Sequence, residues 1–257
     1  MMAAMRFAPM SWLAAVFLFV LVARAEDPQR VLFIGNSYTG VNKLPDVFLS
    51  VVKASGRKEP VVKSSTPGGR TLKQQLGIVA SMKLVDEGGW DVVVLQGQSQ
   101  EPAIAETDEA VRKEFLESAA ELCRRVRAKS PQAKIFFYET WARHADYWTE
   151  NKKASAMGKD PKEMQARLRK WYGVAAKENG AISVPCGEAW ELNYAAAKPV
   201  RLHQKDNSHP ELAGTYLNAL IFFGTIYDVK VPAPKWNGQL DEAQARLMQG
   251  YAAKVLK

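Results

Sequence analysis

Residues 31–39 read VLFIGNSYT, a short apolar run followed directly by a turn of small residues. Such a run is typical of a strand buried in a parallel sheet, and the turn places Ser37 just beyond the strand's carboxyl end. Open α/β sheets bind and transform their ligands at that edge. The stretch therefore predicts an α/β fold and a candidate nucleophile, although Gly-Asn-Ser is also an ordinary turn sequence.

The rest of the chain alternates between strand-like apolar runs and segments with helical periodicity. We expect strands at 31–34, 60–63, 91–95, 134–138 and 181–184, and helices at 44–54, 72–86, 109–129, 162–177, 212–227 and 242–255. This order predicts a three-layer α/β/α sandwich in which helices cover both faces of a five-stranded parallel sheet. Residues 26–257 suit one domain, because nothing along them reads as a linker or a repeat.

A second motif, DNSH at residues 206–209, lies near the carboxyl terminus. A hydroxyl is a poor nucleophile until an imidazole takes its proton, and the imidazole needs a carboxylate to fix its tautomer. The spacing lets Asp206 reach one ring nitrogen of His209 while the other points outward, toward a serine from a distant strand. We therefore expect a catalytic triad of Ser37, Asp206 and His209. The alternative is that Asp206 or the neighbouring serine caps the following helix, and both interpretations can hold together.

These blocks resemble the SGNH hydrolases, also called GDSL esterases and lipases, over most of the chain after residue 25. In that family the serine lies near the mature amino terminus and Asp-x-x-His near the carboxyl terminus. By this resemblance Ser37 is similar to the family nucleophile, and Asp206 and His209 resemble its acid and base. The backbone N–H groups of Ser37 and of Gly69, within PGGRT at 67–71, resemble the oxyanion donors. The fold implied is the flavodoxin-like SGNH sandwich.

The block after the third expected strand departs from the usual family pattern. Where the family usually carries Gly-x-Asn, residues 95–100 read LQGQSQ, which looks more like the Gln-Gly-Glu-Ser block of the sialate O-acetylesterase and acetylxylan esterase branch. A glutamine amide offers the same N–H donor as asparagine on a longer stem, so we expect a glutamine in the oxyanion hole. The resemblance favours Gln96, with Gln98 second because the two side chains share a face in an extended segment. The alternative is that residues 95–100 are only a polar loop at the end of a buried strand.

An aromatic segment follows the fourth expected strand, where residues 139–148 read ETWARHADYW. Aromatic rings stack on sugar rings, so Trp141 and Arg143 are candidate substrate-binding residues. The alternative is that these aromatics line the core, because large rings gain much free energy from burial.

The amino terminus predicts the compartment. Residues 1–25 have the organisation of a secretory signal peptide, with Arg6 ahead of an apolar core at 12–22 and an Ala-x-Ala-like site at the end. The apolar core is shorter than the roughly 20 residues of a spanning helix, and an uncleaved anchor is the alternative. We expect a periplasmic or secreted protein without stable membrane insertion after cleavage. Cys123 and Cys186 permit one disulfide there, although free, partly buried thiols are favoured.

The formal net charge of +8 invites a nucleic-acid interpretation. The arginine-rich stretches 124–127 and 167–170 lie in helical segments, however, where charges ordinarily form the solvated face. We therefore expect no nucleic-acid partner. The three histidines, His144, His203 and His209, show no metal-binding spacing, so we expect no metal. We also expect no organic cofactor.

Together these patterns predict a serine esterase whose substrate is a small-molecule or carbohydrate ester, and by the resemblance an O-acetyl ester. One alternative is a non-catalytic carbohydrate-binding protein on an esterase-like scaffold. Another is an acyltransferase that uses the same triad. Neither the alcohol partner nor the oligomeric state follows from the sequence.

Overall fold

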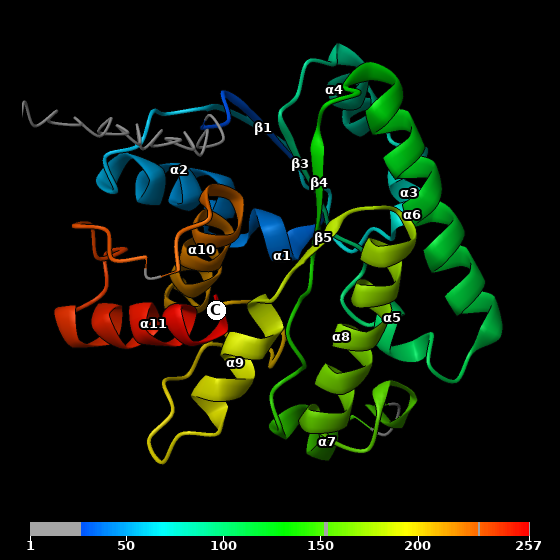
Figure 1. Cartoon of the computed structure of the whole chain (residues 1–257). Coiled ribbons are helices and arrows are strands. Elements are labelled where there is room, and N and C mark those ends of the chain that lie inside the picture. Colours follow the sequence, from blue (N-terminus) through cyan, green and yellow to red (C-terminus); the bar gives the residue numbers. More distant parts are fainter. Residues whose placement is uncertain (1–26, 152–153, 231, 257) are drawn as a thin grey trace, which may run out of the picture.

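The computed structural model describes residues 27–151, 154–230 and 232–256. They form three layers, with a central sheet between two layers of helices (Figure 1). The expected signal peptide, residues 1–25, lies outside the described residues. None of the helices in the described ranges is long and apolar enough to cross a membrane.

The sheet is parallel throughout, with the strand order β2-β1-β3-β4-β5. Its strands are β1 (Arg30–Ile34), β2 (Val61–Ser65), β3 (Val92–Leu95), β4 (Lys134–Tyr138) and β5 (Ile182–Val184). Each strand lies within two residues of its expected range, so the predicted α/β sandwich with a five-stranded parallel sheet is confirmed. The order reverses between β1 and β3, and the crevice at such a reversal is where α/β proteins bind ligands.

Helices cover both faces of the sheet. They are α1 (Ser37–Gly40), α2 (Leu44–Ala54), α3 (Leu72–Leu76), α4 (Val79–Glu87), α5 (Glu101–Ile104), α6 (Glu109–Lys129), α7 (Asp146–Glu150), α8 (Pro161–Glu178), α9 (Cys186–Tyr194), α10 (Leu212–Tyr227) and α11 (Glu242–Val255), with short 3₁₀ turns η1 (Val41–Lys43) and η2 (Ala154–Met157).

Side chains alternate along each strand between two hydrophobic cores. Val31 and Phe33 face the core formed with α2, α9, α10 and α11, whereas Leu32 and Ile34 face the core formed with α3, α4, α5, α6 and α8. Because both faces are covered, the central strands need apolar residues at successive positions. This is why β1 was recognisable as an unbroken apolar run.

The helices differ from expectation, because one expected helix is split and the short helices α1, α5 and α7, together with α9, were not expected. The single helix expected at 72–86 is two helices, because the first ends at the C-cap Gly77 and the second begins after Ile78. Helix α9 was not predicted, since many of its side chains are buried and it lacks the alternation of apolar and polar faces that marks a surface helix.

The two cysteines are free thiols, as the sequence favoured. Cys123 belongs to the core on the α6 side of the sheet, whereas Cys186 belongs to the core on the α10 side. The sheet separates them, so no disulfide joins them. Both are fully buried rather than partly buried.

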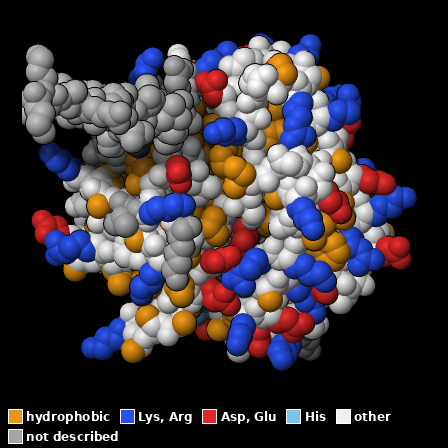
Figure 2. Space-filling view, viewed as in Figure 1, with side chains coloured by type: hydrophobic (Ala, Val, Ile, Leu, Met, Phe, Trp, Pro, Cys, Tyr) orange, Lys and Arg blue, Asp and Glu red, His pale blue; other side chains and the backbone are white. Residues whose placement is uncertain are grey.

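The arginine-rich helices carry ion pairs on their surfaces. Arg124 pairs with Glu121 on α6, and Arg169 of α8 pairs with both Glu188 and Glu191. Figure 2 shows positive and negative side chains intermingled on the face that includes α8. The charges thus form a solvated surface, which is how the sequence pattern was interpreted.

Candidate active site

The nucleophile segment lies at the carboxyl end of β1. Ser37 is the first residue of α1, and Asn36 caps that helix by accepting a hydrogen bond from the backbone N–H of Tyr38. The Asn36 amide nitrogen donates to the carbonyl oxygens of Arg70 and Gly97, at 3.0 and 3.1 Å. One side chain therefore holds the loops after β2 and β3 against the turn that carries Ser37.

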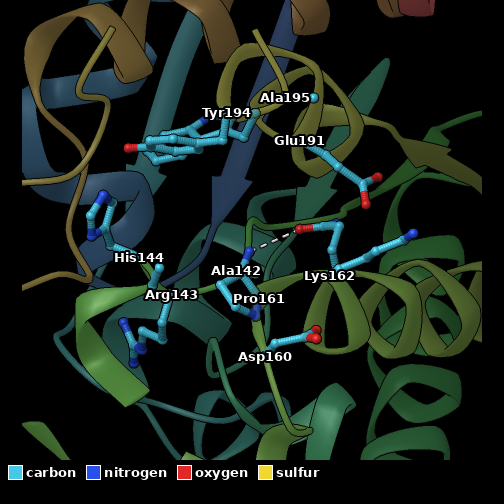
Figure 3. Close-up of a pocket in the computed structure, with 12 residues that line it drawn as sticks. Ala142, Arg143, His144, Asp160, Pro161, Lys162, Glu191, Tyr194 and Ala195 are labelled. Atoms are coloured by element: carbon cyan, nitrogen blue, oxygen red, sulfur yellow. Dashed lines mark hydrogen bonds between the residues drawn. The ribbon is translucent and has the colours of Figure 1, made fainter. Parts of the chain in front are cut away.

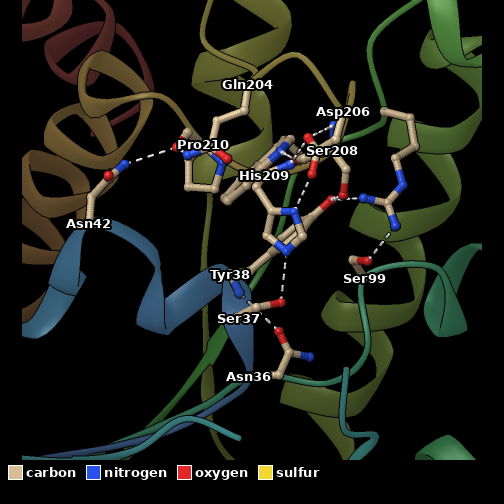
Figure 4. Close-up of polar contacts among 12 residues, drawn as sticks. Asn36, Ser37, Tyr38, Asn42, Ser99, Gln204, Asp206, Ser208, His209 and Pro210 are labelled. Atoms are coloured by element: carbon tan, nitrogen blue, oxygen red, sulfur yellow. Dashed lines mark hydrogen bonds and ion pairs between the residues drawn. The ribbon is translucent and has the colours of Figure 1, made fainter. Parts of the chain in front are cut away.

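The segment before α10 brings Asp206 and His209 to the same place (Figure 4). His209 Nδ1 lies 2.5 Å from Asp206 Oδ2, and His209 Nε2 lies 2.9 Å from Ser37 Oγ. The other carboxylate oxygen of Asp206 accepts the backbone N–H groups of Ser208 and His209, both at 3.0 Å. The three side chains expected to form a triad are thus linked in the order acid, imidazole, hydroxyl.

The alternative role for Asp206, as the cap of the following helix, is wrong. Helix α10 begins at Leu212 with Glu211 as its N-cap, and Asp206 caps only the turn that holds His209. The carboxylate thereby fixes both the backbone and the ring of the histidine.

The carboxylate of Asp206 is held in its ionised form. Partial burial raises its pKa, but the hydrogen bonds from the His209 ring and from two backbone N–H groups outweigh burial, and the pKa lies below its ordinary value. An ionised Asp206 keeps the proton of neutral His209 on Nδ1. Nε2 is then free to accept a proton from Ser37.

The two candidate glutamines of the oxyanion hole have different environments. Gln96 is fully buried; its amide oxygen accepts from the backbone N–H of Asn36 and the hydroxyl of Thr39, and its amide nitrogen donates to the Gly97 carbonyl. Only one of its two amide N–H groups is bonded, but the side chain is fully buried and so presents no donor at the surface to a substrate. The preference for Gln96 is therefore corrected. Its amide oxygen holds Asn36 and Thr39, the residues on either side of the Ser37 turn.

Gln98, in contrast, is only half-buried. Its amide oxygen accepts the backbone N–H groups of Gln100 and Glu101, at 2.7 and 3.1 Å. These bonds fix the side chain, and within the described chain the amide nitrogen has no hydrogen-bond partner. Gly69 also presents an exposed backbone, in the left-handed conformation at φ 69°, in a loop that the Asn36 bond to Arg70 anchors.

Trp141 does not offer a surface to a ligand. It is fully buried, and its ring is stacked between Tyr38 and Trp190 with centroid distances of 4.4 and 4.0 Å. Its indole N–H donates to the Ser208 carbonyl at 3.0 Å. The expectation that Trp141 binds substrate is wrong, because packing of the site loops takes both faces of its ring.

Arg143 is also buried, with 7% of its surface exposed. Its guanidinium donates to the hydroxyl of Tyr38 and, at 3.0 Å, to the hydroxyl of Ser99. It thereby ties α1 to the loop after β3. Contact between Arg143 and a substrate stays a prediction.

Two supporting residues were not predicted from the sequence. Asn36 organises three loops, and the Tyr38 hydroxyl joins Ser208 to Arg143. Both flank Ser37, and adjacency to the candidate nucleophile was the only sequence signal that marked them.

A pocket of about 620 Å³ lies beside the 142–145 segment (Figure 3). It is lined mainly by that segment, by the start of α8 and by the end of α9. The triad residues are not among its lining residues.

A buried carboxyl at the end of β4 makes stability depend on pH. Glu139 is 2% exposed, and its carboxyl accepts the Gln165 amide at 2.9 Å. Burial, reinforced by Glu188, raises the pKa of Glu139 to about 8. Because the unfolded carboxyl has a pKa of about 4.3, the unfolded chain loses this proton first and the folded state loses stability as pH rises from about 5 to 8.

We expect Glu139→Gln to remove this dependence while keeping the oxygen that accepts the Gln165 amide. Between pH 5 and pH 9, the free energy of unfolding should fall more for the wild type than for the variant, by on the order of 4 kcal/mol. Urea titrations at both pH values measure the difference. Parallel pH dependences in the two proteins would show that Glu139 ionises normally.

No family model matches the sequence, and no curated protein does. Solved structures do match. A DUF4886 family protein from Bacteroides uniformis superposes with a TM-score of 0.72 at 18% identity, over 88% of this chain and 93% of that one.

Two further structures relate the fold to named enzymes. The lipase/acylhydrolase from Enterococcus faecalis has a TM-score of 0.59 at 15% identity, over 81% of this chain and 99% of its own. The acetylxylan esterase from Geobacillus stearothermophilus has a TM-score of 0.56 at 14% identity, over 79% and 96%. The protein therefore has the SGNH/GDSL fold that its sequence blocks implied.

Proposed function

We propose that this protein is a secreted or periplasmic serine esterase that hydrolyses small acyl esters. The observation that carries the proposal is the chain of hydrogen bonds from Asp206 through His209 to Ser37. Its order and distances are those that activate a serine hydroxyl.

In the first half of the reaction, Ser37 Oγ attacks the ester carbonyl carbon while His209 Nε2 takes the hydroxyl proton. The tetrahedral oxyanion is held by the backbone N–H groups of Ser37 and Gly69 and by the amide of Gln98. The carbon–oxygen bond to the alcohol then breaks, and His209 returns its proton to the departing alkoxide. Asp206 stabilises the imidazolium between these steps.

The second half releases the acid. A water molecule gives a proton to His209 Nε2 and attacks the acyl–Ser37 carbonyl, forming a second tetrahedral oxyanion in the same hole. Collapse of that intermediate breaks the bond to Ser37 Oγ, which recovers its proton from His209. The products are the free carboxylic acid and the resting enzyme.

An O-acetyl group on carbohydrate is the first substrate class to test. The block at residues 95–100 resembles the acetylxylan esterase branch, and an acetylxylan esterase is among the structures that share this fold. The buried Trp141 provides no sugar-stacking surface, so this residue does not support the alternative of a carbohydrate-binding protein.

Hydrolysis is favoured over acyl transfer by the exposure of the triad. The side chains of His209 and Asp206 are 30% and 46% exposed. An acyltransferase must exclude water from its acyl-enzyme, and an open imidazole admits water as the acceptor.

A fluorophosphonate reagent tests the mechanism directly. Attack by Ser37 on phosphorus should expel fluoride and leave one phosphonyl group on Ser37, identified by peptide mass spectrometry. Hydrolysis of p-nitrophenyl acetate should fall in proportion to the fraction labelled. Full activity after complete labelling of Ser37, or an adduct elsewhere that abolishes activity, would contradict the proposal.

A further inference from the structure

The joint between α1 and α2 has an unusual backbone. Asn42 and Lys43, five and six residues after Ser37, are both in the left-handed region, with φ of 53° and 52°. Asparagine adopts this conformation more readily than most residues, whereas lysine does so at an energetic cost. The turn directs the Asn42 side chain toward the segment that carries His209 (Figure 4).

The Asn42 amide nitrogen bridges to that segment. It donates to the carbonyl oxygen of Pro210 at 2.9 Å and to the hydroxyl of Thr215, in α10, at 3.0 Å. Pro210 directly follows His209, and its carbonyl also accepts the Gln204 amide at 3.2 Å. Asn42 therefore fixes the chain immediately beyond the imidazole.

A second bridge holds the chain immediately before the imidazole. The hydroxyls of Tyr38 and Ser208 are 3.0 Å apart. His209 thus lies between two residues, Ser208 and Pro210, that are each tied to the nucleophile segment. The 2.9 Å contact between His209 Nε2 and Ser37 Oγ spans the gap between these two bridges.

The two bridges are supported differently. Tyr38 is also bound by Arg143 and packed on Trp141, so other contacts hold it in place. The Asn42 bridge depends on one half-buried amide at the end of a left-handed turn. The Pro210 side is also bonded to the 202–204 segment, because the Gln204 N–H donates to the His209 carbonyl and the Glu211 N–H to the Leu202 carbonyl, both at 2.7 Å. Asn42 is what ties this paired segment to the turn after Ser37. Loss of its amide should therefore let the paired segment shift relative to Ser37 while Ser208 stays fixed.

We propose that Asn42 is a positioning residue that sets the distance between the Ser37 hydroxyl and the His209 imidazole. This role presumes the esterase mechanism proposed above. Asn42 touches neither reacting side chain, so it acts through Pro210. Proton transfer from Ser37 depends steeply on that distance, whereas binding of the ester does not.

Asn42→Gly and Asn42→Asp test this role. Glycine accepts the left-handed backbone but lacks the amide, and aspartate keeps the size but presents an oxygen to the Pro210 carbonyl. Both variants should lower kcat for p-nitrophenyl acetate about 10- to 100-fold and leave KM within about twofold. Lys43→Gly and Thr215→Val are the controls, because each leaves the bond to Pro210 intact, and both should keep the wild-type kcat.

The outcomes separate this role from general packing and from the esterase mechanism itself. Wild-type kcat in folded Asn42→Asp, with only a lower melting temperature, would overturn the positioning role. Equal loss of kcat in Thr215→Val would do the same, because the packing of α10 would then be responsible. If Ser37→Ala is inactive but the Asn42 variants are fully active, only the positioning role fails. If Ser37→Ala is fully active, the esterase mechanism itself fails.

Discussion

Ser37→Ala is expected to lower kcat for p-nitrophenyl acetate by on the order of 10⁶-fold, the loss seen when a triad serine is removed. Ser37 Oγ is the hydroxyl to which His209 Nε2 is bound, and its removal leaves the imidazole without a nucleophile to activate. The oxyanion donors are untouched, so a small rate above that in water should remain. Alanine is well tolerated in a helix, and the melting temperature should change little.

The matched control is Ser50→Ala, which removes an exposed hydroxyl bonded only within its own helix, to the Asp46 carbonyl. Its activity should equal that of the wild type in the same assay. If Ser37→Ala kept a tenth or more of the wild-type rate, the nucleophile would have to be another group.

Gln98→Glu is expected to lower kcat by roughly 10²–10³-fold, the usual cost of losing one oxyanion donor. A carboxylate oxygen can still accept the backbone N–H groups of Gln100 and Glu101, so the loop should keep its shape. The second oxygen, however, replaces the N–H donor with a negative charge facing the oxyanion. The loss should fall on kcat, because the ester's ground state carries no such charge.

Gln100→Glu makes the same chemical change two residues away. The Gln100 amide makes only a long contact of 3.4 Å to the Tyr147 hydroxyl, so this variant should retain wild-type kcat. Steady-state kinetics and thermal melts of both variants, measured side by side, test the prediction. A normal kcat in Gln98→Glu would assign the hole to backbone donors alone.

The sheet could be predicted because its central strands are buried on both faces. Burial on two sides requires uninterrupted apolar residues, and a run such as 31–34 is visible without any knowledge of tertiary contacts. The Asp206–His209 pair could be predicted because the contact is local, within one turn. Its connection to Ser37 spans 172 residues and came from the family resemblance together with the chemistry that a serine requires.

The errors share a physical cause, which is that burial and hydrogen-bond partners are decided by distant parts of the chain. Gln96 and Gln98 are two residues apart and would share a face of an extended segment. Only Gln96, however, has its amide oxygen bonded by Asn36 and Thr39. Trp141 has the composition of a sugar platform, but Tyr38 and Trp190 cover its faces. Neither outcome follows from local pattern.

The placement of the two cysteines on opposite sides of the sheet allows local unfolding of each helical layer to be measured. Burial raises the pKa of Cys123 to about 11 and that of Cys186 well above its ordinary value, so both thiols are kept protonated and unreactive while their layer is closed. Each lies on a different side of the sheet. A thiol-specific reagent would therefore report the opening of the two helical layers independently, without any introduced label.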